Sequence, residues 1–157
     1  MRNSTRVVTG IMILCLLVTP AWAIDSAASY ARLIQARSLK CSFSLSMQAD
    51  WRNGRLETSV NSEEVTSHFD SIDLKKGTAR LIGNVGAGDV ITILTAESLT
   101  FIEKTASGNL NFTTVFPFYK NNTQEFLAVT SRHLVLPNRE GVSPFPSQHH
   151  GTCQVWE

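Results

Sequence analysis

A strict alternation of apolar and polar residues is the feature that most limits how this chain can fold. In the segment CSFSLSM, three serines alternate with four apolar residues, which are Cys41, Phe43, Leu45 and Met47. Successive side chains of an extended strand point to opposite faces, so the pattern predicts a half-buried antiparallel strand with Cys41 on its buried face. We expect the strand to reach Trp51 and to return after Asn53-Gly54, a dipeptide that favours two-residue hairpin turns.

Further short, strand-like segments follow as far as the C-terminus. Turn residues separate them at Lys76-Gly77, Gly86-Ala87-Gly88, Ala96-Glu97, Ser107-Gly108-Asn109 and Asn121-Asn122. In the segment LNFTTVFPF, alternation puts Phe112 and Phe116 on one face, which we expect to be the core face. Regular short strands joined by polar turns predict one mainly β domain, an antiparallel β-barrel or β-sandwich of about 8–9 strands.

A helix is expected ahead of the β domain. Residues 24–38 are assigned to this N-terminal helix and residues 39–157 to the β domain. Within the segment DSAASYARLIQAR, Tyr30, Leu33 and Ile34 have the i, i+3, i+4 spacing of one helical face. We expect this face to pack across a sheet or across the mouth of a barrel.

The first 23 residues have the pattern of a cleaved export signal. Arg2 and Arg6 precede an apolar stretch at residues 7–18, and Ala21-Trp22-Ala23 matches an Ala-x-Ala cleavage site. The apolar stretch is shorter than the roughly 20 residues that a membrane-spanning helix needs. We therefore expect cleavage between Ala23 and Ile24, a periplasmic or extracellular location, and no membrane span in the mature chain. A retained signal anchor is the alternative.

The charge of the chain argues against nucleic acid as a partner. The full chain has 14 basic and 13 acidic residues, and loss of Arg2 and Arg6 would leave the mature chain slightly acidic. The longest basic run after the signal is Lys75-Lys76, so the sequence has no electrostatic footprint for nucleic acid. We expect no nucleic-acid binding.

Two cysteines, Cys41 and Cys153, remain once Cys15 is removed with the signal. An isolated pair in an oxidising compartment is usually a disulfide. Because Cys41 lies in the first strand and Cys153 in the last, the bond would bring these two strands together. That arrangement closes an up-and-down barrel, although a sandwich with adjacent terminal strands satisfies it as well.

The segment HHGTC brings His149 and His150 close in sequence to Cys153. A metal site needs a thiolate and neutral imidazoles that converge on one ion. A disulfide removes the thiolate, and neighbouring residues of an extended segment point to opposite faces. We therefore expect a polar loop leading into a disulfide-anchored strand, with no metal and no cofactor.

Two other histidines are candidates for catalysis. His133 lies in phase with apolar residues of its strand, where an imidazole can act as an acid, a base or a ligand but is more often a hydrogen-bonded core residue. His68 has Asp70 two residues further on, on the same strand face, where the carboxylate could orient the imidazole. The G-x-S-x-G motif of serine hydrolases is missing from the sequence.

Residues 137–150 are expected to form a long loop between the last two strands, because three prolines interrupt a regular strand there. Phe145 lies between two of these prolines. We expect it to pack over one end of the β-structure, near Phe112 and Phe116. It would act there either as a lid on a ligand site or as a plug of the core.

These features favour a protein that binds rather than catalyses. Its ligand would be a small apolar molecule or a partner protein, and the candidate ligand-binding residues are Phe112, Phe116, His133 and Phe145. One alternative is a small secreted hydrolase that uses His133 or His68 with a nearby carboxylate. Another is an envelope protein with a structural role.

Overall fold

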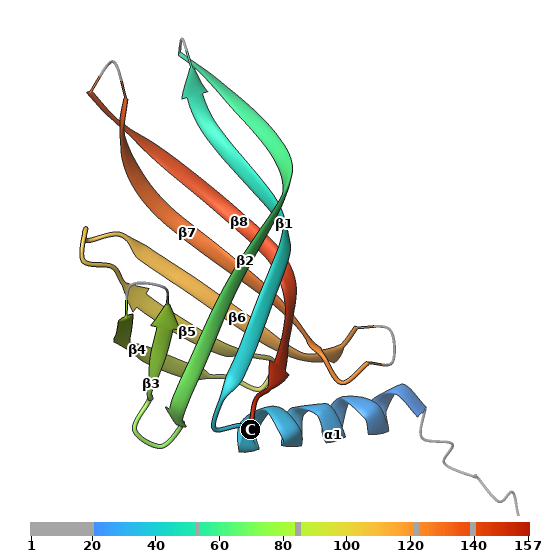
Figure 1. Ribbon diagram of the computed structural model, residues 1–157. Coiled ribbons are helices and arrows are strands. Elements are labelled where there is room, and N and C mark those ends of the chain that lie inside the picture. The colour runs from blue at the N-terminus through green and yellow to red at the C-terminus, as the bar shows by residue number, and fades with distance from the viewer. Residues whose placement is uncertain (1–20, 53, 84–85, 121–122, 139–140) are drawn as a thin grey trace, which may run out of the picture.

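The computed structural model describes residues 21–52, 54–83, 86–120, 123–138 and 141–157, which form eight antiparallel strands and one helix (Figure 1). Each strand pairs with its neighbours in chain order, and β1 also pairs with β8, so the sheet closes into a barrel. The elements are α1 (Ala21–Gln35), β1 (Leu39–Arg52), β2 (Arg55–Asp73), β3 (Thr78–Gly83), β4 (Gly86–Leu94), β5 (Leu99–Lys104), β6 (Leu110–Tyr119), β7 (Phe126–Asn138) and β8 (Gly141–Val155). The prediction of a single mainly β domain with an N-terminal helix is confirmed, and the closed sheet makes it a barrel.

The helix lies across one end of the barrel (Figure 1). The side chain of Leu33 on this helix is fully buried, and the hydroxyl of Ser29 donates a hydrogen bond to the carbonyl oxygen of Pro117 on β6. The helix begins at Ala21, earlier than the expected residues 24–38, while most of the predicted export signal, residues 1–20, lies outside the described residues. In the described part of the chain, no helix combines the length and the apolar character needed to cross a membrane.

Two long hairpins extend from the barrel on the side away from α1 (Figure 1). β1 and β8 pair from Leu39 opposite Val155 to Gln48 opposite Ser147. Beyond this point the β1–β2 hairpin continues to Arg52 and the β7–β8 hairpin to Asn138, each without the other. The hairpins therefore separate where the pairing of β1 with β8 ends.

The expected loop at residues 137–150 is wrong, because most of this segment belongs to β8. Pro144 pairs with Val135 and Pro146 with His133, so the strand runs through both prolines. Proline has no N–H to donate and is tolerated mainly in edge strands. β8 is such an edge strand before Ser147, since its pairing with β1 begins only at that residue.

The buried face of β1 changes phase within the segment that suggested the strand. A β-bulge lies between Phe43 and Leu45, so that Ser46 is completely buried while Leu45 is 41% exposed and Met47 is 46% exposed. A bulge adds one residue to one strand and so exchanges the two faces beyond it. The expected buried alternation is correct for Cys41 and Phe43 and wrong for Leu45 and Met47.

The barrel interior is apolar near α1 and polar toward the hairpins. A ring of inward-facing neighbours near α1 is made of Leu99, Val115, Ala128, Gly151, Phe43 and Val65. The rings of Phe69 and Phe101 stack within this core, with centroids 4.0 Å apart. Large aromatic side chains thus fill the helix end, which stabilises the fold through burial of apolar surface.

Phe112 and Phe116 do not lie on the core face of β6. The buried residues of this strand include Thr113 and Val115, which alternate with the two half-buried phenylalanines. The more apolar face of β6 therefore points outward, because part of the interior that the strand faces is polar. The sequence-based expectation of a core face carrying Phe112 and Phe116 is wrong for this reason.

The predicted disulfide between Cys41 and Cys153 is confirmed. The two residues are directly opposite each other on β1 and β8, with an S–S distance of 1.95 Å, and both are buried. The bond joins the first and last strands at the seam where the barrel closes. A buried structural disulfide is typical of proteins in oxidising compartments.

Candidate functional site

A groove of about 380 Å³ lies where the two long hairpins separate. Its side chains come mainly from the outward faces of β1, β2, β7 and β8, and include Met47, Ala49, Val60, His133, Pro146 and Gln148. Met47 reaches this surface because the bulge in β1 turns it outward. The groove is therefore a product of the bulge together with the early end of the β1–β8 pairing.

The groove is lined by four apolar and seven polar residues, although most of its exposed surface is apolar. Val60 is 62% exposed and Met47 is 46% exposed, so both offer apolar surface to a ligand. No protein-family model, curated protein or solved structure matches this chain. The groove has the size and the mainly apolar surface of small-molecule sites, which measure about 300–1,000 Å³. Methionine is also flexible enough to adapt to ligands of irregular shape.

The four sequence-predicted ligand residues do not converge on one site. His133 lines the groove, and its ring centroid lies 5.3 Å from that of Phe112, which brings these two together. Phe116 is half-buried further along β6 and does not line the groove. Phe145 lies apart from Phe112 and Phe116, in a smaller cavity of about 170 Å³ lined also by Asp50 and Glu57.

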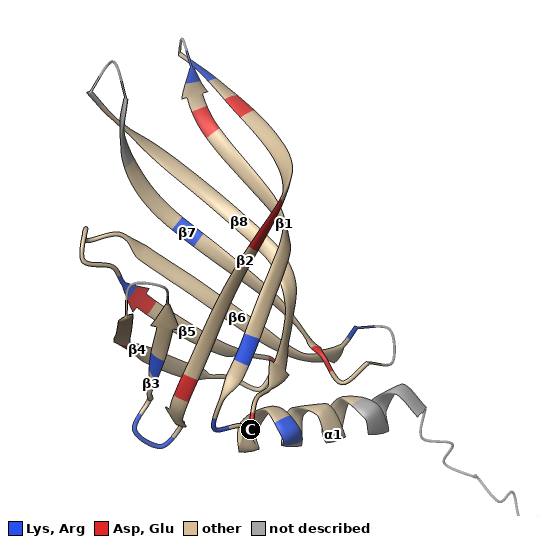
Figure 2. Ribbon diagram, in the orientation of Figure 1, with Lys and Arg blue, Asp and Glu red and all other residues tan. Residues whose placement is uncertain are grey.

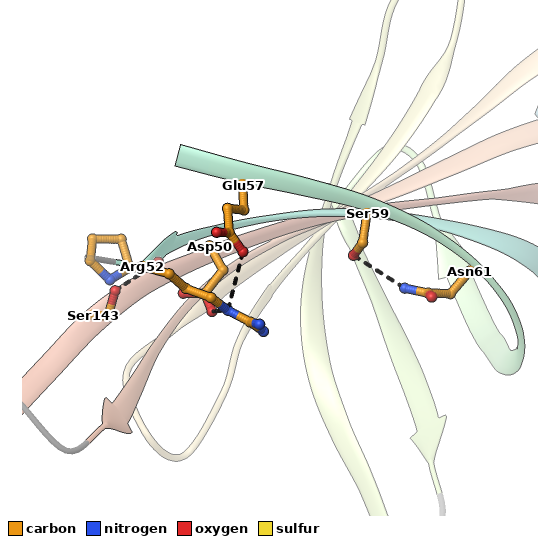
Figure 3. A network of polar contacts seen from close by, with 7 residues as sticks. Asp50, Arg52, Glu57, Ser59, Asn61 and Ser143 are labelled. Atoms are coloured by element: carbon orange, nitrogen blue, oxygen red, sulfur yellow. Dashed lines mark hydrogen bonds and ion pairs between the residues drawn. The ribbon is translucent and has the colours of Figure 1, made fainter. Parts of the chain in front are cut away.

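Charged residues of both signs gather at the far end of the β1–β2 hairpin (Figure 2). Arg52 Nε lies 3.0 Å from a carboxylate oxygen of Asp50 and 3.7 Å from one of Glu57. Figure 3 shows this network beside Ser59 and Asn61, whose side chains are hydrogen-bonded. The smaller cavity that contains Phe145 is therefore bordered by paired charges, unlike the groove.

Hydroxyl groups and one histidine form a polar ring inside the barrel. Each member is paired with the next one on the neighbouring strand. In order from β4 to β2, the inward-facing residues are Thr92, Phe101, Thr113, Thr130, His149, Ser46 and Asn61. Thr113 Oγ1 donates to Thr130 Oγ1 at 2.9 Å. In the next ring toward the hairpins, Asn111 Nδ2 donates to a carboxylate oxygen of Glu103 at 2.6 Å.

His149 is the most deeply buried ionisable side chain of this polar region. It is 1% exposed, its Nε2 lies 3.3 Å from Ser147 Oγ, and its Nδ1 has no hydrogen-bond partner among the described residues. Burial lowers the pKa of His149 below its ordinary value of 6.5, and the positive charge of Arg132 lowers it further, against an opposing effect of Glu63. The imidazole is therefore neutral at pH 7.

Sequence reasoning placed His149 in a polar loop and missed this role. The signal was present, since Ser147, His149, Gly151 and Cys153 share one strand phase. Because Cys153 marks the buried face, the same alternation could have placed His149 inside the barrel.

We expect the stability of the protein to fall as the pH drops below about 6.5. The unfolded chain protonates His149 at its ordinary pKa of 6.5, whereas the folded protein does so only at a lower pH. Between these two values the unfolded state binds more protons, so the free energy of unfolding decreases by up to about 1.4 kcal/mol per pH unit. Above the ordinary pKa this contribution is constant.

Urea unfolding of the wild type and of His149→Gln between pH 5 and pH 8 tests this expectation. Glutamine keeps a polar side chain at the site but does not titrate. The wild type should lose stability more steeply than the variant on the acid side. Identical slopes for the two proteins would show that His149 does not control the acid response.

The other two candidate histidines, His68 and His133, contact groups other than carboxylates in the described structure. His68 Nε2 is 2.8 Å from Ser38 Oγ, while Asp70 lies 3.9 Å from Arg80 Nε. In the described part of the chain, no hydrogen bond or ion pair joins His68 or His133 to a carboxylate. The catalytic alternative therefore gains no support from the geometry.

The HHGTC segment is a strand and does not form a loop. His149 faces the interior, its neighbour His150 lies on the other face of β8, and Cys153 is bonded to Cys41. Over the described ranges, no group of three or more histidine, cysteine, aspartate or glutamate side chains is arranged to hold a metal ion. A metal site in this segment would require the thiolate of Cys153, but this sulfur is bonded to Cys41.

Proposed function

We propose that this protein is an exported binding module that holds a small apolar ligand in the groove between its two long hairpins. The observation that carries the proposal is the pair of exposed apolar side chains, Met47 and Val60, in a groove of about 380 Å³. Burying the part of these two side chains that is still exposed contributes roughly 1 kcal/mol each. His133 and Gln148 supply polar groups at the same site.

Export is supported by the N-terminal pattern and by the disulfide. Arg2 and Arg6 followed by the apolar residues 7–18 have the layout of an export signal, with cleavage expected between Ala23 and Ile24. A disulfide that joins the first and last strands fits folding in the periplasm or outside the cell.

The groove suits an apolar ligand better than the barrel interior does. Near α1 the interior is filled by buried aromatic side chains, including Phe43, Phe69 and Phe101. Toward the hairpins it is lined by hydroxyls and by His149. Polar groups lose hydrogen bonds to water when an apolar molecule covers them, so this second region disfavours such a ligand.

Fluorescence titration with the neutral apolar dye N-phenyl-1-naphthylamine tests the proposal. We expect saturable binding to the wild type and an affinity at least about tenfold lower for Met47→Lys, because the substitution removes apolar contact area from the groove. Met47 is exposed, so the fold should tolerate the lysine.

The matched control is Ile91→Lys. Ile91 is 59% exposed on β4 and lies outside the groove, so the same change there should leave dye binding unaltered. Equal affinities for Met47→Lys and the wild type, or no saturable binding at all, would contradict the proposal.

A further inference from the structure

Among the residues that the structure describes, part of β2 forms a free edge of the sheet. From Arg55 to Ser62 the strand pairs with β1, Glu63 and Glu64 lie at the β-bulge, and β3 joins the other side only from His68 onward. Backbone N–H and C=O groups alternate between the two sides of a strand, so along this segment one set points away from β1. Such an edge is a template for pairing with another extended chain.

The corresponding edge of β7 is partly blocked. β6 pairs with β7 only as far as His133, but the N–H of the next outward residue, Val135, donates to Asn109 Oδ1 at 3.2 Å. Capping of an edge N–H by a side chain hinders the addition of a strand. Within the described residues no side chain accepts from a backbone N–H of β2 between Arg55 and Glu64, although Ser46 Oγ of the paired strand β1 donates to the carbonyl oxygen of Asn61 at 3.5 Å.

The free edge of β2 carries opposite charges at its two ends. Arg55 lies at the hairpin end, and Glu63 and Glu64 lie at the other end, all of them exposed (Figure 2). Among the described residues, none of the three forms an ion pair. When two identical strands pair antiparallel, the basic end of one strand meets the acidic end of the other.

We propose that the partner at this edge is a second copy of the same chain, paired antiparallel through β2 about a two-fold axis at Ser59. In this register Arg55 of each copy lies opposite Glu63 of the other, which makes two ion pairs. Glu57 lies opposite Asn61, an amide that can donate to the carboxylate. The contact is self-complementary, as a two-fold dimer interface must be.

Charge selects this register over its neighbour. Centring the two-fold axis on Val60 would place Glu57 of each copy opposite Glu63 of the other, and like charges directly opposite each other destabilise a sheet. With the axis at Ser59, the outward-facing Thr58 lies opposite Val60 instead. Because Val60 lines the ligand groove, the dimer would join two grooves on one continuous outer face.

Sedimentation velocity of the exported, disulfide-bonded protein tests the proposal through a charge exchange. We expect a dimer whose dissociation constant rises roughly tenfold in Arg55→Glu and in Glu63→Arg, because each substitution acts at both ends of the interface. The double variant Arg55→Glu/Glu63→Arg should restore the affinity of the wild type. A monomer at every concentration, or a dimer whose dissociation constant is the same in the wild type and the single variants, would overturn the proposal.

Cysteine cross-linking tests the register itself. Ser59→Cys places two thiols opposite each other across the two-fold axis, so oxidation should yield a covalent dimer. In the matched variant Asn61→Cys, the thiols lie four residues apart along the strands, about 13 Å, which is too far for a disulfide. Cross-linking of Asn61→Cys as fast as Ser59→Cys would refute this register. Dimerisation and dye binding use different variants, so either can fail without the other.

Discussion

Gly151→Ala is expected to lower the free energy of unfolding by about 3 kcal/mol or more, a large effect for the addition of one methyl group. A Cβ atom at this position would lie 2.0 Å from the carbonyl oxygen of Ser42 and 2.6 Å from the Cα of Phe43. Both atoms belong to the backbone of β1, so no side-chain rotation can relieve the contact. β8 would have to move away from β1, next to the disulfide and to the bulge.

Gly88→Ala is the matched control for this substitution. Gly88 also lies in a strand, and a Cβ there meets nothing within 4 Å. Urea unfolding followed by circular dichroism should show a stability close to that of the wild type for Gly88→Ala and a large loss for Gly151→Ala. Equal stabilities for the two variants would mean that β1 and β8 are further apart than described.

Loss of the disulfide should have the second large effect. Cys41 and Cys153 are 112 residues apart, and on the chain-entropy model closing a loop of this length contributes about 4–5 kcal/mol to stability. We therefore expect the thermal midpoint of the wild type to fall sharply when a reductant is added. The double variant Cys41→Ala/Cys153→Ala should unfold at a low midpoint whether or not a reductant is present.

Thiol labelling checks that the bond exists before its contribution is measured. Alkylation of the exported protein without a reductant should modify neither Cys41 nor Cys153. Labelled cysteines on freshly purified protein would argue against a disulfide at the seam between β1 and β8. A thermal midpoint that does not change when a reductant is added would argue against it as well.

The architecture could be predicted because two independent signals agreed. Alternation and regular turns indicated antiparallel strands, and the phase of Cys41 placed its disulfide on the buried face of the first one. The pairing with Cys153 then brought the last strand to the first, which is the closure observed. Only the choice between barrel and sandwich needed the structure.

The candidate site was harder to predict because it depends on a local irregularity. The bulge after Phe43 turns Met47 from the expected core face to the groove, and nothing in the strict alternation of the sequence signals that bulge. Val60 was not considered, since its contribution depends on how the two hairpins separate. His133 was found because a histidine among apolar strand residues is conspicuous, but it was considered as an inward-facing side chain, whereas the structure leaves it exposed on the outer face with Leu127 and Val135.

The wrong expectation for Phe112 and Phe116 has a second cause. Phe112 and Phe116 were assigned to the core face on the assumption that apolar residues face inward, and Phe145 was expected to pack over the end of that core as a lid or a plug. The interior of this barrel is polar toward the hairpins, so on β6 the usual relation between apolar side chains and burial is reversed. Phe145 was also placed in a loop because the prolines beside it were read as strand breakers, whereas an edge strand accepts them.

Native mass spectrometry of the protein from the exported fraction of its own host tests the ligand proposal most directly. We expect a polypeptide mass that corresponds to a chain beginning at Ile24, together with a non-covalent apolar adduct that dissociates on activation. The adduct should persist on Ile91→Lys and be lost from Met47→Lys. A bare polypeptide in every sample, or an adduct that Met47→Lys retains in full, would contradict binding in the groove.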